Sequence, residues 1–490
     1  MNRALKRISI AVLVMFLALL INVNYLQGFQ TASLATRPDN IRGLEGQYQH
    51  ERGDIFTADG VKVAGTTPSN DVQNYLRVYY NPQVYAPVTG YVTPYSSTGV
   101  ESAENGVLSG NDASLSFRNF IDLITNKPRK GATVGLTINS KDQMAAYEGL
   151  KSRLAGTSNT GGVVAINPKT GAILALASWP SYDTNLLAVH DGTTLNTNDQ
   201  QLLAESPSPL VNYAADATYP PGSTFKIVTT STWFTQSSAN TPNTSLASPQ
   251  PLRLPNGNFL NNDNGEQCGD GSGQTPAITA FAQSCNTPFA GLGIKLGGQA
   301  LKGMADSFGY NQNLAIPGVT SAASNFTAES DGSFTAFDAI GQHDTTASAM
   351  EEAMMAAAIA NGGTLMKPYL VQQVTASDLS VVSQASSTVL SQPITPAVAS
   401  FENQMMVAVV KSGTAADPVN AAGAQGLDIA GKTGTAQNGS NGSDKSDAVF
   451  TAFAPANNPT IAVGVIVQGG GYGAAAAAPI AIAVIQAALG

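Results

Sequence analysis

The chain begins with a short basic segment and a long apolar run, which together restrict where the rest of the protein can fold. The apolar run extends from Ile8 to Ile21 and weakly on to Leu26, three basic residues precede it, and the next charge is Arg37. Basic residues stay on the cytoplasmic side of a membrane, so a helix over this run places the remaining chain outside the cytoplasm. We expect residues 1–7 to form a cytoplasmic tail and residues 8–26 a retained single-pass membrane anchor. The run is shorter than the ~20 residues that span a bilayer comfortably, so a cleaved signal peptide is the alternative.

Length and charge exclude some classes of function. At 490 residues the chain is longer than one ordinary domain, which favours two or three. It has 24 Lys and Arg against 33 Asp and Glu, a net charge of -9. Nucleic-acid binding needs basic patches that displace counterions, so we expect no nucleic-acid partner.

Cysteine and histidine usage bears on redox state and metals. Cys268 and Cys285 fit an exported chain in which a disulfide can persist, although two buried thiols are also compatible with the sequence. The histidines are His50, His190 and His343, and the chain has neither an H-x-x-x-H pair nor a C-x-x-C pair. We therefore expect no metal site and no cofactor.

The composition changes near residue 160 and suggests a division there. Residues 27–160 are rich in Gly, Asn, Ser and Tyr, with strand-like stretches at 75–80 and 133–138 between turn residues, which is typical of an α+β module. A linker-like "GTSNTGG" follows. Residues 161–490 then open with two apolar stretches around the turn signal Asn167-Pro168-Lys169-Thr170-Gly171, which predicts a hairpin.

The rest of this second region reads as helices followed by a sheet. Helical patterns dominate from 223 to 363, including the Ala- and Met-rich stretch 346–363. A terminal helix over 474–490 is expected to lie on an antiparallel meander. The three strands of that meander are predicted at 427–436, 448–455 and 460–470.

One helix start combines residues that suit nucleophilic catalysis. Pro220, Pro221 and Gly222 stop any preceding helix and allow a new one to begin near Ser223. Lys226 lies three positions later and therefore on the same helical face. A serine hydroxyl is a poor nucleophile until a base takes its proton, and a lysine does this when burial or another cation lowers its pKa. Taken alone, S-x-x-K usually marks a solvated helix face.

Two further motifs follow Ser223 and Lys226 in the order that this chemistry needs. Ser284-Cys285-Asn286 supplies S-x-N, and Lys432-Thr433-Gly434-Thr435 supplies K-T-G within a strand pattern. S-x-x-K, then S-x-N, then K-T-G is the ordered set of penicillin-binding proteins and serine β-lactamases. Each motif is weak alone, but the ordered set is specific.

Three other matches to these motifs are set aside. Ser238-Ala239-Asn240 is also S-x-N, but it lies roughly 22 Å from Ser223 if the same helix continues. Ser109-Gly110-Asn111 lies in the first region. Lys411-Ser412-Gly413 ends a helical pattern, whereas the chemistry needs a strand edge, so we choose Lys432.

The chain resembles the class B penicillin-binding proteins, and in particular the short actinobacterial penicillin-binding protein A type. Besides the three motifs, the resemblance rests on segments 51–64, 97–110, 135–146 and 161–185, so it covers nearly the whole chain. It implies an α+β, membrane-anchored, two-domain protein. A non-catalytic N-terminal pedestal would occupy 27–160. A serine transpeptidase/β-lactamase-like domain, with an antiparallel sheet flanked by helices and an all-α subdomain, would occupy 161–490.

The resemblance also implies a role for each motif residue. Ser223 would attack the penultimate D-alanine carbonyl of a peptidoglycan stem peptide, and Lys226 would take its proton. Ser284 would return a proton to the leaving D-alanine, while Asn286 orients Lys226 and the substrate. The remaining assignments are an oxyanion site from the N–H groups of Ser223 and Thr435, and a substrate carboxylate site around Lys432, Thr433, Gly434 and Thr435.

The family's pattern is altered at two places. Cys285, at the centre of S-x-N, should point away from the site, and a bridge to Cys268 would tie this loop to the preceding segment. The usual G-Q-G turn is Gly341-Gln342-His343 here, and we take His343 as structural.

The implied function is peptidoglycan cross-linking in cell-wall synthesis and division, with β-lactams acylating the same serine. A β-lactamase would need an added glutamate, and none of Glu329, Glu351, Glu352 and Glu402 has an E-x-x-L-N setting. A D,D-carboxypeptidase or a non-catalytic β-lactam-binding scaffold remain alternatives. Beside the membrane, the implied partners are a membrane glycosyltransferase or division proteins.

Overall fold

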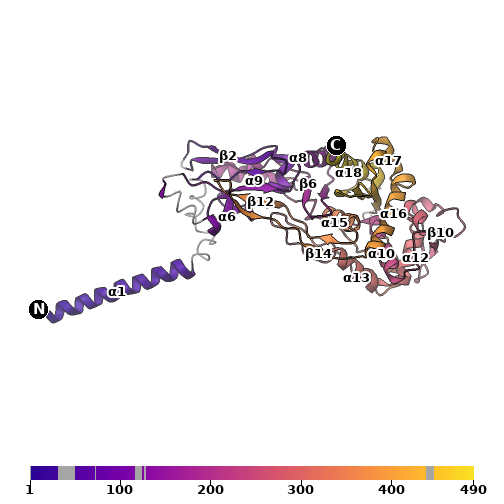
Figure 1. Ribbon diagram of the computed structural model, residues 1–490, viewed down its shortest axis with the longest axis horizontal. Helices are drawn as coiled ribbons and strands as arrows, with labels where there is room; N and C mark the ends of the chain where they lie inside the picture. The colour runs from indigo at the N-terminus through magenta and orange to yellow at the C-terminus, as the bar shows by residue number, and fades with distance from the viewer. Residues whose placement is uncertain (1, 31–49, 72, 116–123, 126–127, 438–445) are drawn as a thin grey trace.

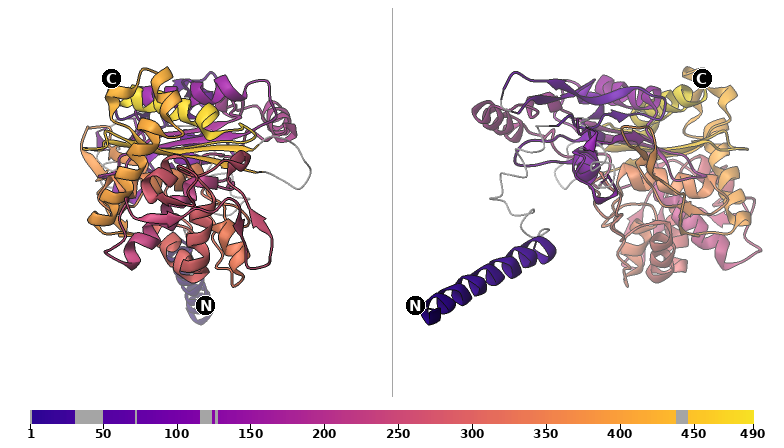
Figure 2. Two further views of the ribbon diagram at one scale, coloured as in Figure 1. Left: turned by 90° about the vertical axis from the view of Figure 1, so that its right-hand side faces the viewer. Right: turned by 60° about the vertical axis from the view of Figure 1, so that its left-hand side comes forward.

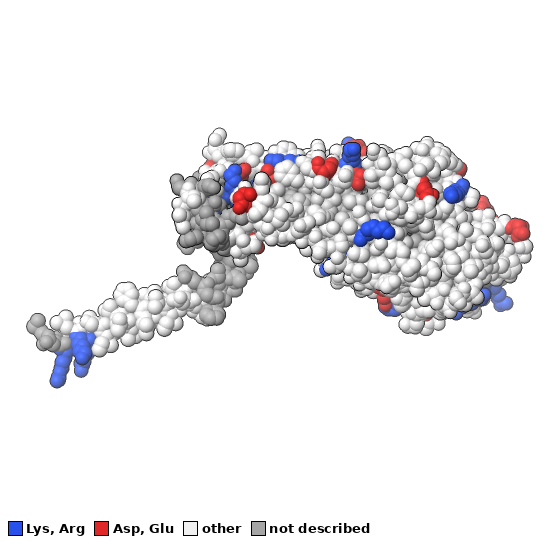
Figure 3. All heavy atoms as spheres, in the orientation of Figure 1, with Lys and Arg blue, Asp and Glu red and all other residues white. Residues whose placement is uncertain are grey.

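The computed structural model describes residues 2–30, 50–71, 73–115, 124–125, 128–437 and 446–490. Helix α1 (Asn2–Phe29) extends away from an elongated body (Figure 1). Its segment Leu5–Leu26 has a mean hydropathy of 2.2 and none of it is buried, so it is long and apolar enough to cross a membrane. Lys and Arg atoms gather at its N-terminal end, and charges are scattered over the face of the body that Figure 3 shows. The helix fits the single-pass anchor predicted over 8–26.

A six-stranded sheet organises the part of the body next to α1. Its strand order is β13-β12-β4-β1-β2-β3. Strands β1 and β4 pair in parallel, and the other neighbours pair antiparallel. The strands are β1 (Ile55–Phe56), β2 (Lys62–Pro68), β3 (Tyr75–Tyr79), β4 (Thr133–Leu136), β12 (Val371–Thr375) and β13 (Val381–Gln384), accompanied by α4 (Pro82–Thr89), α5 (Gly99–Ala103) and α6 (Asn105–Leu108).

The second large sheet has five antiparallel strands in the order β15-β16-β17-β5-β6. The predicted hairpin is β5 (Gly161–Ile166) with β6 (Ile173–Trp179). The predicted meander is confirmed as β15 (Ala430–Ala436), β16 (Asp447–Ala454) and β17 (Ile461–Val467).

Helices cover both faces of this sheet, which explains why every residue of β16 and β17 is buried. The terminal helix α18 (Gly473–Leu489) and helix α8 (Ser140–Leu154) pack against one face, and α15 (Ala349–Ala360) packs against the other (Figure 2). All residues of α15 are buried. A helix that is apolar around most of its circumference belongs inside a protein, and α15 is such a helix except at Glu351 and Glu352.

A helical part lies beyond α15, as the pattern over 223–363 predicts. It is interrupted by short strands within residues 245–276, where Pro and Gly are frequent and break helices. The elements are η3 (Gly222–Phe225), α10 (Lys226–Gln236), β7 (Ser245–Ala247), β8 (Leu252–Arg253), β9 (Phe259–Leu260), β10 (Gln274–Pro276), α11 (Ala277–Ala282), α12 (Thr287–Leu296), α13 (Gly298–Phe308), α14 (Gly332–Asp338) and α16 (Pro396–Ser412). Outside this part, α9 (Gly192–Ala204), α17 (Ala416–Ala421), β11 (Leu365–Met366) and β14 (Val389–Ser391) complete the main elements.

The chain crosses between the two sheets on both sides of residue 161. Helix α8 precedes this position but packs on the five-stranded sheet, and strands β12 and β13 follow it but complete the six-stranded sheet. The domain division at 161 remains a prediction, and the two halves are interlocked across it.

Candidate active site

The nucleophile candidate lies on a tight turn that leads directly into a helix. The 3-10 turn η3 contains Ser223 and continues into α10 at Lys226, which agrees with the predicted helix start. Gly222 has a φ of 56°, and a Cβ there would lie only 2.6 Å from the carbonyl oxygen of Thr435. Only glycine allows this backbone conformation and this approach to β15 at low cost. Ser223 itself is half-buried.

Lys226 is fully buried and points at the S-x-N loop. Its Nζ donates to the backbone oxygen of Ser284 at 2.7 Å and to Oδ1 of Asn286 at 2.9 Å, and lies 3.5 Å from Ser284 Oγ. Burial, and then the nearby Lys432 cation, lower the pKa of Lys226 well below its usual value. A neutral lysine has two N–H donors, and these two acceptors use both, which leaves its lone pair available to a hydroxyl proton.

The S-x-N loop is held by backbone geometry and by a remote asparagine. Ser284 has a φ of 59°, a left-handed conformation that is uncommon outside glycine and is often found at functional sites. Asn286 leads into α12, where its N–H and that of Thr287 donate to Oδ1 of Asn262 at 2.8 and 3.0 Å. Asn262 thus satisfies donors at the start of α12 and fixes the position of Asn286.

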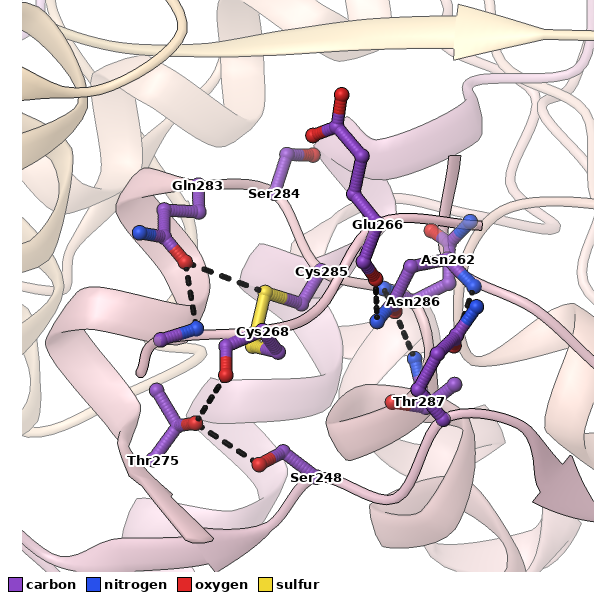
Figure 4. The surroundings of a disulfide bond; sticks show 12 residues. Ser248, Asn262, Glu266, Cys268, Thr275, Gln283, Ser284, Cys285, Asn286 and Thr287 are labelled. Carbon is purple, nitrogen blue, oxygen red and sulfur yellow. Dashed lines mark hydrogen bonds between the residues drawn. A yellow bond between two sulfur atoms is a disulfide. The ribbon is translucent and has the colours of Figure 1, made fainter. Parts of the chain in front are cut away.

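A disulfide joins Cys268 to Cys285, 17 positions apart, in the arrangement that the sequence left open. The sulfur of Cys285 and the side chain of Ser284 point to opposite sides of the loop, as expected for the middle residue of S-x-N (Figure 4). Gln283 adds a second tie, since its Oε1 accepts from the N–H of Gly269 at 2.8 Å. The loop that carries Ser284 is therefore attached to the segment with Cys268 and Gly269, on the side away from the Ser284 side chain.

Lys432 reaches the same serine from the edge strand of the five-stranded sheet. Its Nζ donates to Ser284 Oγ at 2.8 Å and to the backbone oxygen of Thr433 at 2.9 Å. Burial lowers the pKa of Lys432 to about 7. Ser284 Oγ therefore lies between two lysine amines, and its own hydrogen is free to point toward Lys226.

The remaining K-T-G residues pack against the nucleophile turn and neighbouring helices. A Cβ at Gly434 would lie 2.4 Å from the carbonyl oxygen of Pro221, so this position needs glycine. Thr433 is buried and shares a 2.6 Å hydrogen bond with Thr414. Thr435 is half-buried, and its Oγ1 accepts from the N–H of Gly473 at 3.4 Å.

Two contacts escaped the sequence analysis. Asn262 lies far from α12 along the chain, so nothing in the local sequence indicates its role. Thr414 directly follows the rejected Lys411-Ser412-Gly413 match, at the end of α16. That match supplies no lysine to the site, but the hydroxyl after it supports Thr433.

The Gly341-Gln342-His343 turn closes the site beside the nucleophile. Gly222 N–H donates to Gly341 O at 2.9 Å. The His343 ring stacks on Phe334 with centroids 4.6 Å apart, and its Nδ1 lies 3.2 Å from Asp338 Oδ1. These contacts suit the structural interpretation of His343.

A serine on a helix start, a paired lysine, an S-x-N loop and a K-T-G edge strand on an antiparallel sheet define the serine transpeptidase and β-lactamase class. The penicillin-binding protein transpeptidase domain family matches residues 161–486, and the penicillin-binding protein A dimerisation domain family matches residues 52–134. The chain belongs to the class B penicillin-binding proteins, D,D-transpeptidases that act by serine acyl transfer.

Individual relatives resemble the chain over its full length. The peptidoglycan D,D-transpeptidase PbpA of Mycolicibacterium smegmatis is 39% identical over 500 residues, which span 100% of this chain and 99% of the relative. PbpA of Mycobacterium tuberculosis is 38% identical over the same shares. A ceftriaxone acyl-enzyme structure of penicillin-binding protein A from M. tuberculosis has a TM-score of 0.86 and 37% identity, covering 91% of this chain and 100% of that one.

Proposed function

We propose that this chain cross-links peptidoglycan stem peptides through an acyl-enzyme on Ser223. The observation that carries the proposal is the pair of contacts from Lys226 Nζ to Ser284 O and Asn286 Oδ1. They fix a buried amine three residues after Ser223, and burial lowers the pKa of this amine well below its usual value, which suits a base. The M. smegmatis and M. tuberculosis relatives are named peptidoglycan D,D-transpeptidases, which supports this substrate class.

Acylation proceeds by proton transfer to Lys226. Ser223 Oγ attacks the carbonyl carbon of the penultimate D-alanine and forms a C–O bond while its proton passes to Lys226 Nζ. The peptide C–N bond then breaks, and the terminal D-alanine leaves as an amine that takes a proton through Ser284. Ser284 suits this step because its Oγ lies 3.5 Å from Lys226 Nζ and 2.8 Å from Lys432 Nζ.

Charge that develops on the substrate oxygen is stabilised by the N–H groups of Ser223 and Thr435. The close approach of Gly222 to Thr435 supports this role, since it brings the two backbones together. Lys432 and the Thr435 hydroxyl receive the terminal carboxylate, while Gly434 allows the strand to approach Pro221 and Thr433 supports the strand through its contact with Thr414. A bound carboxylate raises the pKa of Lys432 from about 7 and keeps it charged while Lys226 stays neutral.

An amine from a neighbouring stem peptide completes the reaction by attacking the acyl carbon. The new C–N bond replaces the C–O bond to Ser223, and the amine proton returns to the serine oxygen. β-Lactams enter at the first step and leave a lasting acyl-serine. Glu351, Glu352 and Glu402 are buried, and the half-buried Glu329 lacks the E-x-x-L-N setting of a deacylating glutamate, which supports slow deacylation.

The anchor is proposed to cross the membrane with residues 1–7 in the cytoplasm and the body outside, by the positive-inside rule. The N-terminal region would act as a pedestal that sets the active site at a distance from the membrane. We place a membrane glycosyltransferase or division proteins as its docking partners. Protease added outside intact cells should then digest the body and leave a short N-terminal fragment.

Fluorescent penicillin added to the full chain in detergent tests the proposed nucleophile. A long-lived adduct should map to the peptide with Ser223, vanish in Ser223→Ala and slow sharply in Ser284→Ala. Ser238→Ala is the matched control, because it changes the unused S-x-N match and should label at the wild-type rate. Adduct that persists in Ser223→Ala sinks the assignment, and adduct that clears within seconds indicates a β-lactamase.

A stem peptide ending in D-Ala-D-Ala, offered with and without an acceptor amine, then separates the remaining functions. Cross-linked product is the expected result. Release of D-alanine without cross-linking indicates a carboxypeptidase, and acylation without turnover of any peptide indicates a scaffold.

A further inference from the structure

Two consecutive glutamates interrupt the otherwise apolar helix α15. Glu351 and Glu352 are 3% and 0% exposed. In the part of the chain that the structure describes, no basic side chain forms an ion pair with Glu352. A buried charge without a cation is costly, so this carboxyl group must be accounted for in another way.

The contacts of Glu352 join the elements that carry two of the catalytic motifs. Its Oε1 lies 2.8 Å from Oγ1 of Thr224, the residue directly after Ser223. Its backbone oxygen accepts from Thr451 Oγ1 at 2.6 Å, and Thr451 is the cross-strand partner of Lys432. Glu352 thus connects the nucleophile turn to the strand beside K-T-G.

Counting hydrogens shows which state of Glu352 this arrangement needs. Thr224 Oγ1 also lies 2.9 Å from the carbonyl oxygen of Pro221, which can only accept a hydrogen bond. Thr224 has one hydroxyl hydrogen, and a carboxylate would need that same hydrogen. Both contacts are satisfied when Thr224 donates to Pro221 and a protonated Glu352 donates to Thr224.

We propose that Glu352 is a positioning residue that, as a neutral carboxylic acid, donates to Thr224 and thereby fixes Ser223 for attack. The relay from Glu352 through Thr224 to Pro221 closes the turn on which Ser223 stands. Pro221 O in turn lies against Gly434, so the relay also fixes this turn against β15. The proposal rests on Ser223 being the nucleophile.

The surroundings support the neutral state. Burial raises the pKa of Glu352 to about 8, against the hydrogen bond with Thr224. Burial, together with Glu352, raises the pKa of Glu351 well above its usual value. Among the described residues, one buried side-chain oxygen of each of Glu351, Glu352 and Tyr310 has no hydrogen-bond partner, so no group in this part of the chain compensates a negative charge there.

Glu402 on α16 provides a matched control, because it is a second buried glutamate that hydrogen-bonds to hydroxyl groups on α10. It is also fully buried, and its Oε1 lies 2.7 Å from Thr230 Oγ1 and accepts from Ser231 Oγ at 3.0 Å. These hydroxyls lie further along α10 and not on the turn with Ser223. Thr230 Oγ1 also lies 2.8 Å from the backbone oxygen of Lys226, a contact within the helix that does not need Glu402. Loss of Glu402 should therefore weaken the fold without displacing the nucleophile.

The test measures acylation of the full chain in detergent by a fluorescent penicillin, separating the saturating rate constant from the apparent dissociation constant. Glu352→Ala should lower the rate constant by roughly ten- to a hundredfold with little change in the dissociation constant, because a small misplacement of a reacting atom costs this much. Glu352→Gln should restore the rate to within about threefold, because its amide N–H also donates to Thr224. Glu402→Ala should acylate at nearly the wild-type rate.

A double-mutant cycle with Thr224→Val keeps the proposal testable if Glu352→Ala folds poorly. Because Glu352 acts through Thr224, Thr224→Val combined with Glu352→Gln should be no slower than Thr224→Val alone. A wild-type rate constant in Glu352→Ala, or equal losses in Glu352→Ala and Glu402→Ala, overturns the proposal. If Ser223→Ala still forms the adduct, the nucleophile assignment fails instead, and the two failures are distinguishable.

Discussion

The two halves of the body bury carboxyl groups by opposite means. Near the six-stranded sheet, Glu101 is fully buried between two arginines, with Arg52 Nε and Arg77 Nε each 2.6 Å from one of its oxygens. Near the five-stranded sheet, Glu352 and Glu402 are equally buried, and within the described residues their carboxyl groups hydrogen-bond to hydroxyl groups and form no ion pair. The first half pays for its buried acid with ion pairs, whereas the second keeps its acids neutral.

The pKa directions follow this difference. Burial acts to raise the pKa of Glu101, but the Arg52 and Arg77 cations outweigh it and hold that pKa below its usual value. Burial raises the pKa of Glu352 and of Glu402 to about 8. An ionised carboxylate near Lys226 would raise the pKa of this lysine and make it a poorer base. Neutral acids can stabilise the catalytic helix without this effect.

Removing an arginine from the Glu101 cluster should have the largest effect on stability. Arg77→Ala leaves Glu101 with one cation, and breaking a buried ion pair in this way costs about 3–5 kcal/mol. The thermal midpoint of the full chain should fall, while the folded fraction still reacts with penicillin at the wild-type rate. Lys151→Ala is the control, since its exposed pair with Glu148 contributes at most about 0.5 kcal/mol. An unchanged midpoint for Arg77→Ala contradicts the role given to this cluster.

In the catalytic half, the disulfide between Cys268 and Cys285 links two segments covalently, as the Glu101 cluster links segments by ion pairs in the other half. Cys268→Ala with Cys285→Ala should cost about 2–4 kcal/mol and also slow acylation, because Ser284 adjoins Cys285. Reducing the wild-type protein should give the same two changes, and the reductant should not affect the double variant. Destabilisation with normal acylation would mean that the bridge does not position Ser284.

Replacing each buried glutamate by glutamine compares the acid that is paired with arginines to the acid that hydrogen-bonds to hydroxyl groups. Glu101→Gln removes a charge that both arginines need and should cost about 1.5–3 kcal/mol. At pH 5, Glu402→Gln replaces a neutral acid by a neutral amide and should cost less than about 1 kcal/mol. The measurement is the thermal midpoint of each variant against wild type. If Glu101→Gln and Glu402→Gln lower the midpoint equally, Glu402 is ionised like Glu101.

The sequence predicted the parts of this molecule that depend on local pattern. The period of apolar residues located the meander, and the order of the motifs predicted that Lys226, Ser284, Asn286 and Lys432 meet, as the structure shows. Helical spacing placed only Lys226 beside Ser223, and the strand setting selected Lys432. The ordered motif set and its family resemblance joined these residues to Ser284 and Asn286.

Long-range contacts were not predictable in this way. Arg52 and Glu101 lie in segments that carried the family resemblance, yet the sequence assigned them no role, because their pairing depends on how separate segments fold together. The same holds for β12, which joins β4 from nearly half the chain away, and for the Asn262 contact with α12. The acids in α15 were visible as two charges in an apolar helix, but their neutral state depends on neighbours that only the fold supplies.

The opposite pKa shifts predict opposite pH dependences, with a slope of about 1.4 kcal/mol per pH unit for each group that titrates. Glu101 has a lowered folded pKa, so its contribution is present above the unfolded pKa and is lost as pH falls through the folded pKa. Glu402 has a folded pKa of about 8, so its contribution is complete below the unfolded pKa and is lost as pH rises toward 8. Raising the pH from 5 to 8 should therefore lower the thermal midpoint of wild type relative to that of Glu402→Gln, so that the variant becomes the more stable protein, whereas wild type and Glu101→Gln should converge only in acid. Parallel curves for wild type and Glu402→Gln across pH 5 to 8 would place Glu402 among ordinary ionised carboxylates and remove the contrast between the two halves.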